Sequence, residues 1–518
     1  EGCGDCSLKS NCLSVEPVET DLGRKRRINQ STCNTDLSCL KGFCPSFVTV
    51  TDGEAAWESQ ARPSFSADGL PLPETPPLTE PYNVLFTGVG GTGVTTVAAV
   101  LAMAAHVDGH AASSLDMTGL AQKGGPVLSH IRFAREPDMI STGRVPPASA
   151  DVIIACDLVV AAGGDALNLM DADRTAAYAN TDVTPTSEFI RDRSKRFESD
   201  LLSARVRRQA TEFAAFDAEA LAVGYLHDAI YTNMIMAGYA WQKGKLPVSL
   251  RALYRAIRLN GTKVEDNMAA FNVGRIAAAD PERLAKQQDP RGDVQEKTLD
   301  ELIEDRAARL TAYQNADYAA QYRAVVAKVR AAETAAGLGE KLTRAAAIYA
   351  YKVMAYKDEY EVARLFTDGK FAEQLASQFK GGKLRFWLAA PMIAKKDQHG
   401  HFQKKHFGPW MMTGFRLLAK FKGLRGTRFD FFGYTEERQH ERKLRDDYLA
   451  GLERMASGLT AKNHELAVAI ATVPDEIRGF GHVKDAALVT ARAKEADLWA
   501  GWPEGKLPAT KTTLIAAQ

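Results

Sequence analysis

The sequence has almost no net charge and no long hydrophobic run. Its 65 lysines and arginines balance 64 acidic residues, so a general nucleic-acid or membrane-surface binder is not expected. The longest apolar stretch, Val97 to Val107, is too short to span a bilayer. Nothing at the N-terminus resembles a targeting peptide, and free cysteines suit a reducing compartment, so we predict a cytoplasmic protein.

Several catalytic signatures are missing as well. The sequence has no nucleophile elbow, no paired-histidine zinc motif and no kinase signature. It also lacks the thiamine-diphosphate pattern, a Gly-Asp-Gly followed some thirty residues on by Asn. The sequence therefore leaves the catalytic residues unknown, and no complete active site is expected within these residues.

Cysteine is scarce except at the start of the chain. Six of the seven cysteines lie in the first 45 residues, and they are Cys3, Cys6, Cys12, Cys33, Cys39 and Cys44. The first three read C-x2-C-x5-C, and the last three read C-x5-C-x4-C with Pro45 following. A Cys-Pro that ends a cysteine run is how ferredoxin-type domains pass one ligand to the neighbouring cluster. We therefore predict that these six residues bind at least one [4Fe–4S] cluster.

Two alternatives stay open for the same cysteines. A structural zinc needs four ligands, and Cys3 and Cys6 with Cys39 and Cys44 have acceptable spacing. Disulfides are a third option, although no signal peptide supports them. The spacing also departs from the bacterial C-x2-C-x2-C-x3-C-P run, and two full clusters need eight thiolates. The cluster number, one or two, is not fixed.

The remaining sequence divides into three parts. Residues 51–81, with six prolines and six acids against one arginine, predict an extended linker between a cysteine module (1–50) and the next domain. Residues 82–280 predict an α/β domain, with strands at 83–87, 127–133 and 151–155 and helices at 94–107, 217–242, 249–259 and 265–279. Residues 281–518 predict a mostly helical α+β region of unknown role, charged and helical over 295–335. The expected fold class is α/β, with a small ferredoxin-like module, a doubly wound domain and this helical region.

A glycine turn joins the first strand and helix of that α/β domain. Backbone N–H groups at such a helix start favour an anion, so a phosphate cradle is one interpretation and a tight turn is the other. Its predicted binding residues are Gly88, Gly90, Gly91, Thr92 and Gly93. The spacing G-x-G-G-x-G is not the dinucleotide fingerprint, and neither Asp108 nor Asp116 clearly ends a second strand. A second turn could hold an anionic substrate or form an ordinary loop, and its residues are Gln122, Lys123, Gly124 and Gly125.

A basic stretch lies late in the chain. Residues 380–428 carry twelve lysines and arginines and one acid, interleaved with aromatic residues. The stretch either docks an acidic or phosphorylated partner by electrostatic attraction or forms a solvated face.

Long blocks of the sequence, in one order, resemble the indolepyruvate:ferredoxin oxidoreductase family of the 2-oxoacid:ferredoxin oxidoreductase superfamily, in its long fused bacterial form. The cysteine module, from EGCGDC to GFCPSFVTV, resembles that family's ferredoxin-like insert. FTGVGGTGVTTVAAVLAMAAH, DMTGLAQKGGPVLSHIRFA, TNMIMAGYA and NMAAFNVGR resemble its gamma-type domain. YKVMAYKDEYEVARLF, LRGTRFDFFGYTEERQHER and IRGFGHVK resemble its C-terminal region. Many gamma-type domains have Gln at the position of Thr92, which leaves a role for that side chain open.

The resemblance implies a function. Enzymes of this family oxidatively decarboxylate aryl pyruvates with coenzyme A to acyl-CoA and carbon dioxide, and ferredoxin accepts the electrons. Thiamine diphosphate with Mg²⁺ performs the carbon chemistry in a region that precedes the cysteine module. This chain begins inside a cysteine motif, so we expect it to be the electron-relay and gamma-type portion of such an enzyme. The enzyme is also expected to be a homo-oligomer. The alternative function is a self-contained Rossmann-like nucleotide-binding module with a structural zinc.

Overall fold

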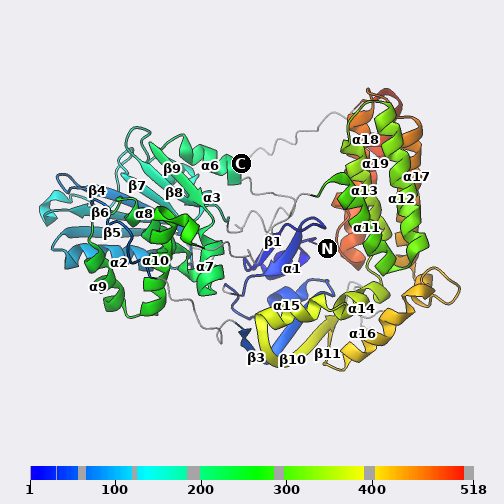
Figure 1. Cartoon of the computed structure of the whole chain (residues 1–518), viewed down its shortest axis with the longest axis horizontal. Coiled ribbons are helices and arrows are strands. Elements are labelled where there is room, and N and C mark those ends of the chain that lie inside the picture. Colours follow the sequence, from blue (N-terminus) through cyan, green and yellow to red (C-terminus); the bar gives the residue numbers. More distant parts are fainter. Residues whose placement is uncertain are drawn as a thin grey trace.

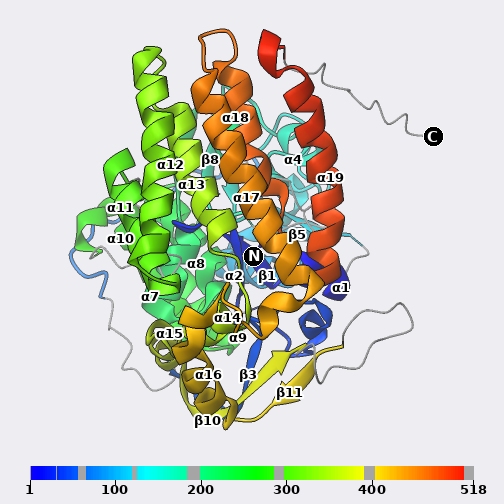
Figure 2. The ribbon, with the colours of Figure 1, turned by 90° about the vertical axis from the view of Figure 1, so that its right-hand side faces the viewer.

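The computed structural model describes residues 2–30, 32–56, 66–119, 125–183, 199–284, 297–389 and 403–506. The protein has a mixed α/β architecture, which confirms the predicted fold class. Figure 1 shows the cysteine-bearing residues between an α/β domain and a bundle of long helices. Figure 2 shows the same bundle from its outer side.

The α/β domain is built on one mixed sheet with the strand order β5-β6-β4-β7-β8-β9. The strands are β4 (Tyr82–Val89), β5 (Ala111–Thr118), β6 (Pro126–Ala134), β7 (Val152–Ala155), β8 (Ala176–Asn180) and β9 (Glu212–Phe216). Strands β4, β7, β8 and β9 are parallel, and β6 pairs antiparallel with both β4 and β5.

The sheet is covered on both faces. Val84 and Phe86 of β4 pack into one apolar core, and Leu85 between them packs into another, because successive side chains of a strand point to opposite faces. The first core is covered by α2 (Val94–Val107), α7 (Ala218–Leu226), α8 (Thr232–Gln242), α9 (Leu250–Asn260) and α10 (Val264–Ala279). The second is covered by α3 (Leu158–Ala161), α4 (Gly164–Leu167) and α6 (Ser199–Arg207). The domain is therefore doubly wound.

One predicted helix is wrong in its extent. The stretch over 217–242 is two helices, α7 and α8, because the chain turns at His227, whose φ of 61° lies in the left-handed region. The predicted helix at 94–107 agrees with α2.

A second, three-stranded sheet joins distant parts of the chain. Strand β3 (Val48–Ala55) pairs antiparallel with β10 (Phe379–Leu388), which also pairs with β11 (Lys405–Phe407). Residues 51–55, which composition placed in the linker, are thus the second half of β3. Helices α14 (Glu359–Thr367), α15 (Lys370–Gln378) and α16 (Met411–Lys420) accompany this sheet. Phe366, Phe386 and Phe415 form its apolar core.

The helical bundle forms a separate apolar core. Its helices are α11 (Leu299–Tyr313), α12 (Ala316–Ala335), α13 (Lys341–Met354), α17 (Glu436–Ser457), α18 (His464–Thr472) and α19 (Gly481–Ala500). The buried Glu333 carboxylate accepts hydrogen bonds from the backbone N–H groups of Leu342 and Thr343, each at 2.8 Å. It therefore caps the start of α13 from a neighbouring helix. Among the described residues, no helix is long and apolar enough to cross a bilayer.

Helices α8 and α10 of the α/β domain cross at two glycines. A Cβ atom placed on Gly238 would lie 2.1 Å from the carbonyl oxygen of Phe271, and one on Gly274 would lie 1.9 Å from that of Ile235. Backbone atoms cannot move aside as a flexible side chain can. The close crossing of these two helices therefore requires glycine at both positions.

We predict that Gly238→Ala and Gly274→Ala each lower the free energy of unfolding by about 1–3 kcal/mol, because the added methyl group overpacks the crossing. Gly164→Ala is the matched control, since a Cβ there has no atom of the described residues within 4 Å. Urea unfolding followed by circular dichroism measures all three. Equal stability of the three variants would contradict the close crossing.

Candidate functional site

The cysteine module is a short helix, a hairpin and a loop that folds back onto the helix. Helix α1 (Asp5–Ser10) carries Cys6, and the 3₁₀ helix η1 (Ser38–Lys41) carries Cys39. A Cβ on Gly42 would lie 2.7 Å from the Cα of Cys6, so only glycine allows the returning loop this close. The backbone N–H of Phe43 donates to the Asp5 carboxylate at 2.8 Å. These two contacts bring Cys44 back to the start of the chain.

Cys44 lies with two cysteines of the first run. Burial raises the pKa of Cys6 to about 11, and the neighbouring Cys3 and Cys44 raise it further by electrostatic interaction. Burial also raises the pKa of Cys3, and Cys44 is again among its neighbours. We refer to Cys3, Cys6 and Cys44 as the first cysteine group. Its members come from both sequence runs.

The other three cysteines make the second cysteine group. Burial raises the pKa of Cys39, and Cys33 and Cys12 contribute in the same direction. Cys12 belongs to the first sequence run and the other two belong to the second. Cys44 of the second sequence run thus joins the first group, and Cys12 of the first run joins the second group. All seven cysteines of the chain are free thiols.

The four cysteines with zinc-like spacing are divided by this arrangement. The cysteines that raise the pKa of Cys39 are Cys33 and Cys12, and those that raise the pKa of Cys6 are Cys3 and Cys44. Among the described residues, no three His, Cys, Asp or Glu side chains are placed to hold a single metal ion. Each group provides three thiols, one fewer than the four cysteine ligands that a [4Fe–4S] cluster takes.

Two cations that the sequence did not identify lie beside the cysteines. The Lys404 ammonium donates to the backbone carbonyl of Cys44 at 3.3 Å and lies 4.6 Å from the centroid of the Phe47 ring. Burial lowers the pKa of Lys404 to about 8, and Cys44, Cys39 and Cys6 oppose that shift. Burial lowers the pKa of Arg26 to about 10, and Cys6 opposes it most. Arg26 belongs to the basic run 24–27 within the cysteine module, so the sequence alone could have suggested it. Lys404 lies more than 350 residues from Cys44 in the chain, so nothing in the sequence indicated that the two are neighbours.

The glycine turn follows β4 and is held by its own backbone. The N–H of Gly90 donates to the carbonyl of Gly125 at 2.8 Å, and the N–H of Thr92 donates to the carbonyl of Val89 at 3.3 Å. Gly91 (φ 91°) and Gly93 (φ 87°) adopt the left-handed backbone that other residues rarely adopt. A Cβ on Gly88 would lie 2.5 Å from the Val94 side chain. Two of the N–H groups expected for an anion are therefore already engaged within the protein.

Side chains complete the turn. The Thr92 hydroxyl donates to the carbonyl of Val89 at 2.7 Å, and the Asn233 amide donates to the carbonyl of Thr92 at 2.7 Å. Asp108 accepts from the backbone N–H and the hydroxyl of Ser249, so it holds in place the residue that caps the N-terminus of α9. Asp116 accepts from the Ser129 hydroxyl on the adjacent strand. Gln122, Lys123 and Gly124 lie outside the described residues.

Acidic residues lie where the cysteine module approaches the α/β domain. Burial, followed by the neighbouring Asp182, raises the pKa of Glu219 to about 10, and Glu16 of the cysteine module adds to the shift. The raised pKa favours the neutral form of the Glu219 carboxyl group. A neutral carboxyl group removes one of the like charges that would otherwise repel at this contact.

Two family models match the chain. Residues 83–277 match the family described as pyruvate ferredoxin/flavodoxin oxidoreductase. Residues 299–497 match a family of unknown function (DUF6537). The two matches cover the α/β domain and most of the C-terminal region.

Known proteins resemble the first of these regions. The indolepyruvate oxidoreductase subunit IorB of Pyrococcus horikoshii is 30% identical over 204 residues, which are 38% of this chain and 96% of the relative. The same subunit of Thermococcus kodakarensis is 28% identical over 210 residues, with shares of 38% and 96%. The gamma subunit of a keto/oxoacid ferredoxin oxidoreductase from Geobacter sulfurreducens has 19% identity over 38% of this chain and 98% of its own, with a TM-score of 0.28. A TM-score this low does not establish a shared fold.

The identity and coverage of the first relative establish homology. The resemblance seen in the sequence blocks is thereby confirmed for the α/β domain. The chain belongs to the pyruvate ferredoxin/flavodoxin oxidoreductase family, and it combines a gamma-type domain homologous to the IorB subunits of indolepyruvate oxidoreductase with a DUF6537 region.

Proposed function

We propose that this chain is the electron-relay and gamma-type portion of an indolepyruvate:ferredoxin oxidoreductase that depends on thiamine diphosphate. The reaction is the oxidative decarboxylation of an aryl pyruvate with coenzyme A, which gives acyl-CoA and carbon dioxide and passes two electrons to ferredoxin. The observation that carries the proposal is that one chain joins a gamma-type domain to six cysteines in two groups.

The donor chemistry of the two groups favours iron–sulfur clusters. Each group offers three thiols, and thiolates are the ligands of [4Fe–4S] clusters. Cys44, which precedes Pro45, lies with cysteines of the first sequence run, and Cys12 lies with cysteines of the second. In ferredoxin-type domains, the cysteine before such a proline likewise binds the neighbouring cluster. In the proposed sites, Cys3, Cys6 and Cys44 hold one cluster, and Cys12, Cys33 and Cys39 contribute to a second.

The cations beside the cysteines support the same assignment. A cluster bound by thiolates is anionic and becomes more so on reduction, and a nearby cation stabilises it. Arg26 lies beside the first cysteine group and Lys404 lies beside cysteines of both groups, where the two cations would offset that charge. A cluster bound there would accept and release single electrons, and these residues would hold it in a partly buried setting.

The place of the module in the fold suits a relay. The cysteine-bearing residues lie between the α/β domain and the helical bundle (Figure 1), so a cluster there is close to both. We propose that thiamine diphosphate and Mg²⁺ bind to a region outside this chain, in the same polypeptide or another one. Ferredoxin is the proposed electron acceptor, a homo-oligomer is the proposed assembly, and the reducing cytoplasm is the compartment that free thiols require.

Substitution of single cysteines tests the cluster. We expect Cys6→Ser and Cys39→Ser each to lower the iron content of the anaerobically purified chain by roughly half, since each group holds one cluster in this proposal. Cys156→Ala is the matched control, because Cys156 is buried in the α/β domain beside Asp157. Iron and zinc are measured by plasma emission spectrometry, together with the absorbance near 400 nm. A colourless protein with stoichiometric zinc, or unchanged iron in both serine variants, would contradict the proposal.

A second prediction concerns activity. The purified chain should not reduce a viologen dye with indolepyruvate, coenzyme A, thiamine diphosphate and magnesium, because the relay has no electron donor without the thiamine-binding region. Addition of that region should give coenzyme-A-dependent reduction of ferredoxin. Turnover by the 518-residue chain alone would place the active site within these residues and overturn this division.

A further inference from the structure

An open cavity of about 540 Å³ lies where the proline-rich linker crosses the α/β domain. One wall is formed by linker residues 66–70 and 72, and the other by side chains of α9 and α10. The domain holds the linker in place, because Gln242 donates to the carbonyl of Pro71 at 2.6 Å. Arg283 also donates to the carbonyl of Ser66, at 2.8 Å. The volume falls in the range of small-molecule sites in proteins.

A buried arginine of α10 lines this cavity, and its hydrogen-bond partners are all uncharged. Arg275 is only 3% exposed. Its Nε group donates to the side-chain oxygen of Gln242 at 3.0 Å. Its Nη1 group donates to the side-chain oxygen of Asn272 at 3.3 Å and to the Tyr254 hydroxyl at 3.4 Å. Among the described residues, no carboxylate pairs with this guanidinium.

The Nη2 group of Arg275 keeps its two N–H donors, since no atom in the described part of the chain accepts from it. Trp241 contacts the face of the guanidinium, with the Cζ atom 5.1 Å from the ring centroid, and this contact leaves the N–H edge open. The side-chain oxygen of Asn272 accepts from the Tyr254 hydroxyl at 2.6 Å, whereas its NH₂ group has no acceptor in the residues described. Two neighbouring side chains on the cavity therefore retain donors.

A buried cation without an anionic partner destabilises the folded chain, because burial removes the water that would stabilise its charge. An anion bound in the cavity would offset this cost. Asp68 also lines the cavity, but it is exposed and its carboxylate accepts from the Ser66 hydroxyl. Solvent therefore screens the charge of Asp68 more than that of Arg275.

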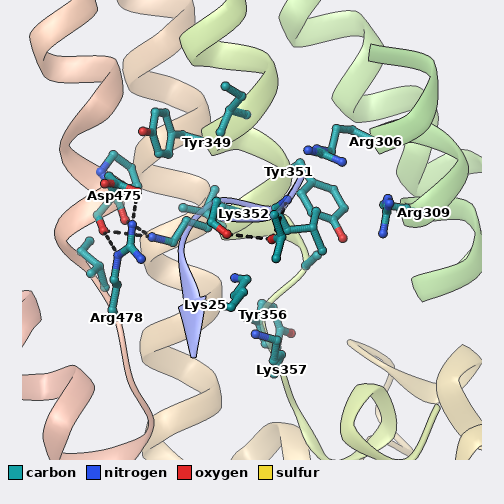
Figure 3. A pocket seen from close by; sticks show the side chains of 18 of the residues that line it. Lys25, Arg306, Arg309, Tyr349, Tyr351, Lys352, Tyr356, Lys357, Asp475 and Arg478 are labelled. Carbon is teal, nitrogen blue, oxygen red and sulfur yellow. Dashed lines mark hydrogen bonds and ion pairs between the residues drawn. The ribbon is translucent and has the colours of Figure 1, made fainter. Parts of the chain in front are cut away.

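A second cavity differs in this respect. It measures about 410 Å³ and lies between the helical bundle and the β1–β2 hairpin, which is formed by β1 (Val15–Val18) and β2 (Lys25–Ile28). Figure 3 shows this cavity with Arg309 on one side. Arg309 pairs with Asp305 at 2.9 Å, so its charge is already balanced within the chain. Arg275 has no such partner among the described residues.

Aliphatic side chains form much of the remaining wall of the Arg275 cavity. They are Leu70 and Leu72 of the linker, Leu250 of α9 and Met268 of α10. Leu72 is 70% exposed, so the chain itself leaves this apolar surface uncovered. Such groups pack against the apolar part of a ligand and exclude water. The cavity thus combines a single cation with an aliphatic surface.

We propose that this cavity binds a small organic carboxylate with an aliphatic body. A carboxylate is planar, carries one negative charge and can accept from Arg275 and Asn272 together. A phosphate dianion would bring a second charge, for which the residues lining the cavity provide no further cation. The site is made of the gamma-type domain and the linker alone, so it does not depend on iron–sulfur clusters.

Saturation-transfer NMR of the full chain tests the ligand class, with hexanoate, its neutral amide hexanamide, and acetate as probes. We expect hexanoate to bind about tenfold more tightly than hexanamide, because only the carboxylate brings a charge to Arg275. Acetate should also bind more weakly than hexanoate, because it lacks the aliphatic body. Absence of hexanoate binding, or binding of either other probe as tightly as hexanoate, would overturn the proposed class.

Matched arginine variants locate the binding. Arg275→Gln should weaken hexanoate binding about tenfold, since the charge-assisted contact is lost. Arg258→Gln removes the same charge from an exposed position of α9 outside the cavity wall and should leave the affinity unchanged. Equal weakening by both variants would mean a general attraction of anions to the chain and would overturn the site.

Matched leucine variants test the same site without a change to a buried residue, and they decide the matter if circular dichroism shows that Arg275→Gln does not fold. Leu72→Asp should weaken hexanoate binding about tenfold, because it places a like charge on the wall and removes apolar surface. Leu201→Asp is the control, since Leu201 is 59% exposed on α6, which covers the other face of the sheet. Unchanged binding by Leu72→Asp, or equal loss in both variants, would overturn the site.

Discussion

The pairing of β3 with β10 is the constraint on which the rest of the arrangement depends. It joins residues 48–55 to residues 379–386 in an antiparallel register that runs from Val48↔Phe386 to Ala55↔Phe379. A chain segment that leaves the cysteine module therefore cannot swing away from the C-terminal region. The pairing also places β11, and with it Lys404, beside Cys44.

The β1–β2 hairpin has a different environment on each side. Lys25 lines a cavity between the hairpin and the helical bundle, and the next residue, Arg26, lies beside Cys6. Successive side chains of a strand point to opposite faces, which explains how two adjacent cations face two different parts of the protein. Arg478 contributes from the bundle by donating to the carbonyl of Arg24 at 3.0 Å. The hairpin is thus the shared wall between the thiols and the cavity.

The sequence could predict the elements that depend on local pattern. The buried strand at 83–87 and the helix at 94–107 were predictable because a short apolar run and a long apolar helix follow one another across glycines. Strand β8 was not, because Ala176–Asn180 is rich in alanine, which has little preference for strands. Its place is set by pairing with β7 and β9, which local sequence does not reveal. The six cysteines were visible too, but their grouping was not, since the close approach of Gly42 to Cys6 brings Cys44 to Cys3 through tertiary contacts alone.

Two iron–sulfur clusters on cysteines exchanged between the sequence runs are the centre of the proposed relay. The most direct test is electron paramagnetic resonance of the dithionite-reduced, reconstituted chain, with Cys44→Ser compared against Cys3→Ser and Cys33→Ser. We expect Cys44→Ser to lose the same signal as Cys3→Ser, and Cys33→Ser to lose the other. A Cys44→Ser spectrum that matches Cys33→Ser instead would contradict the exchange.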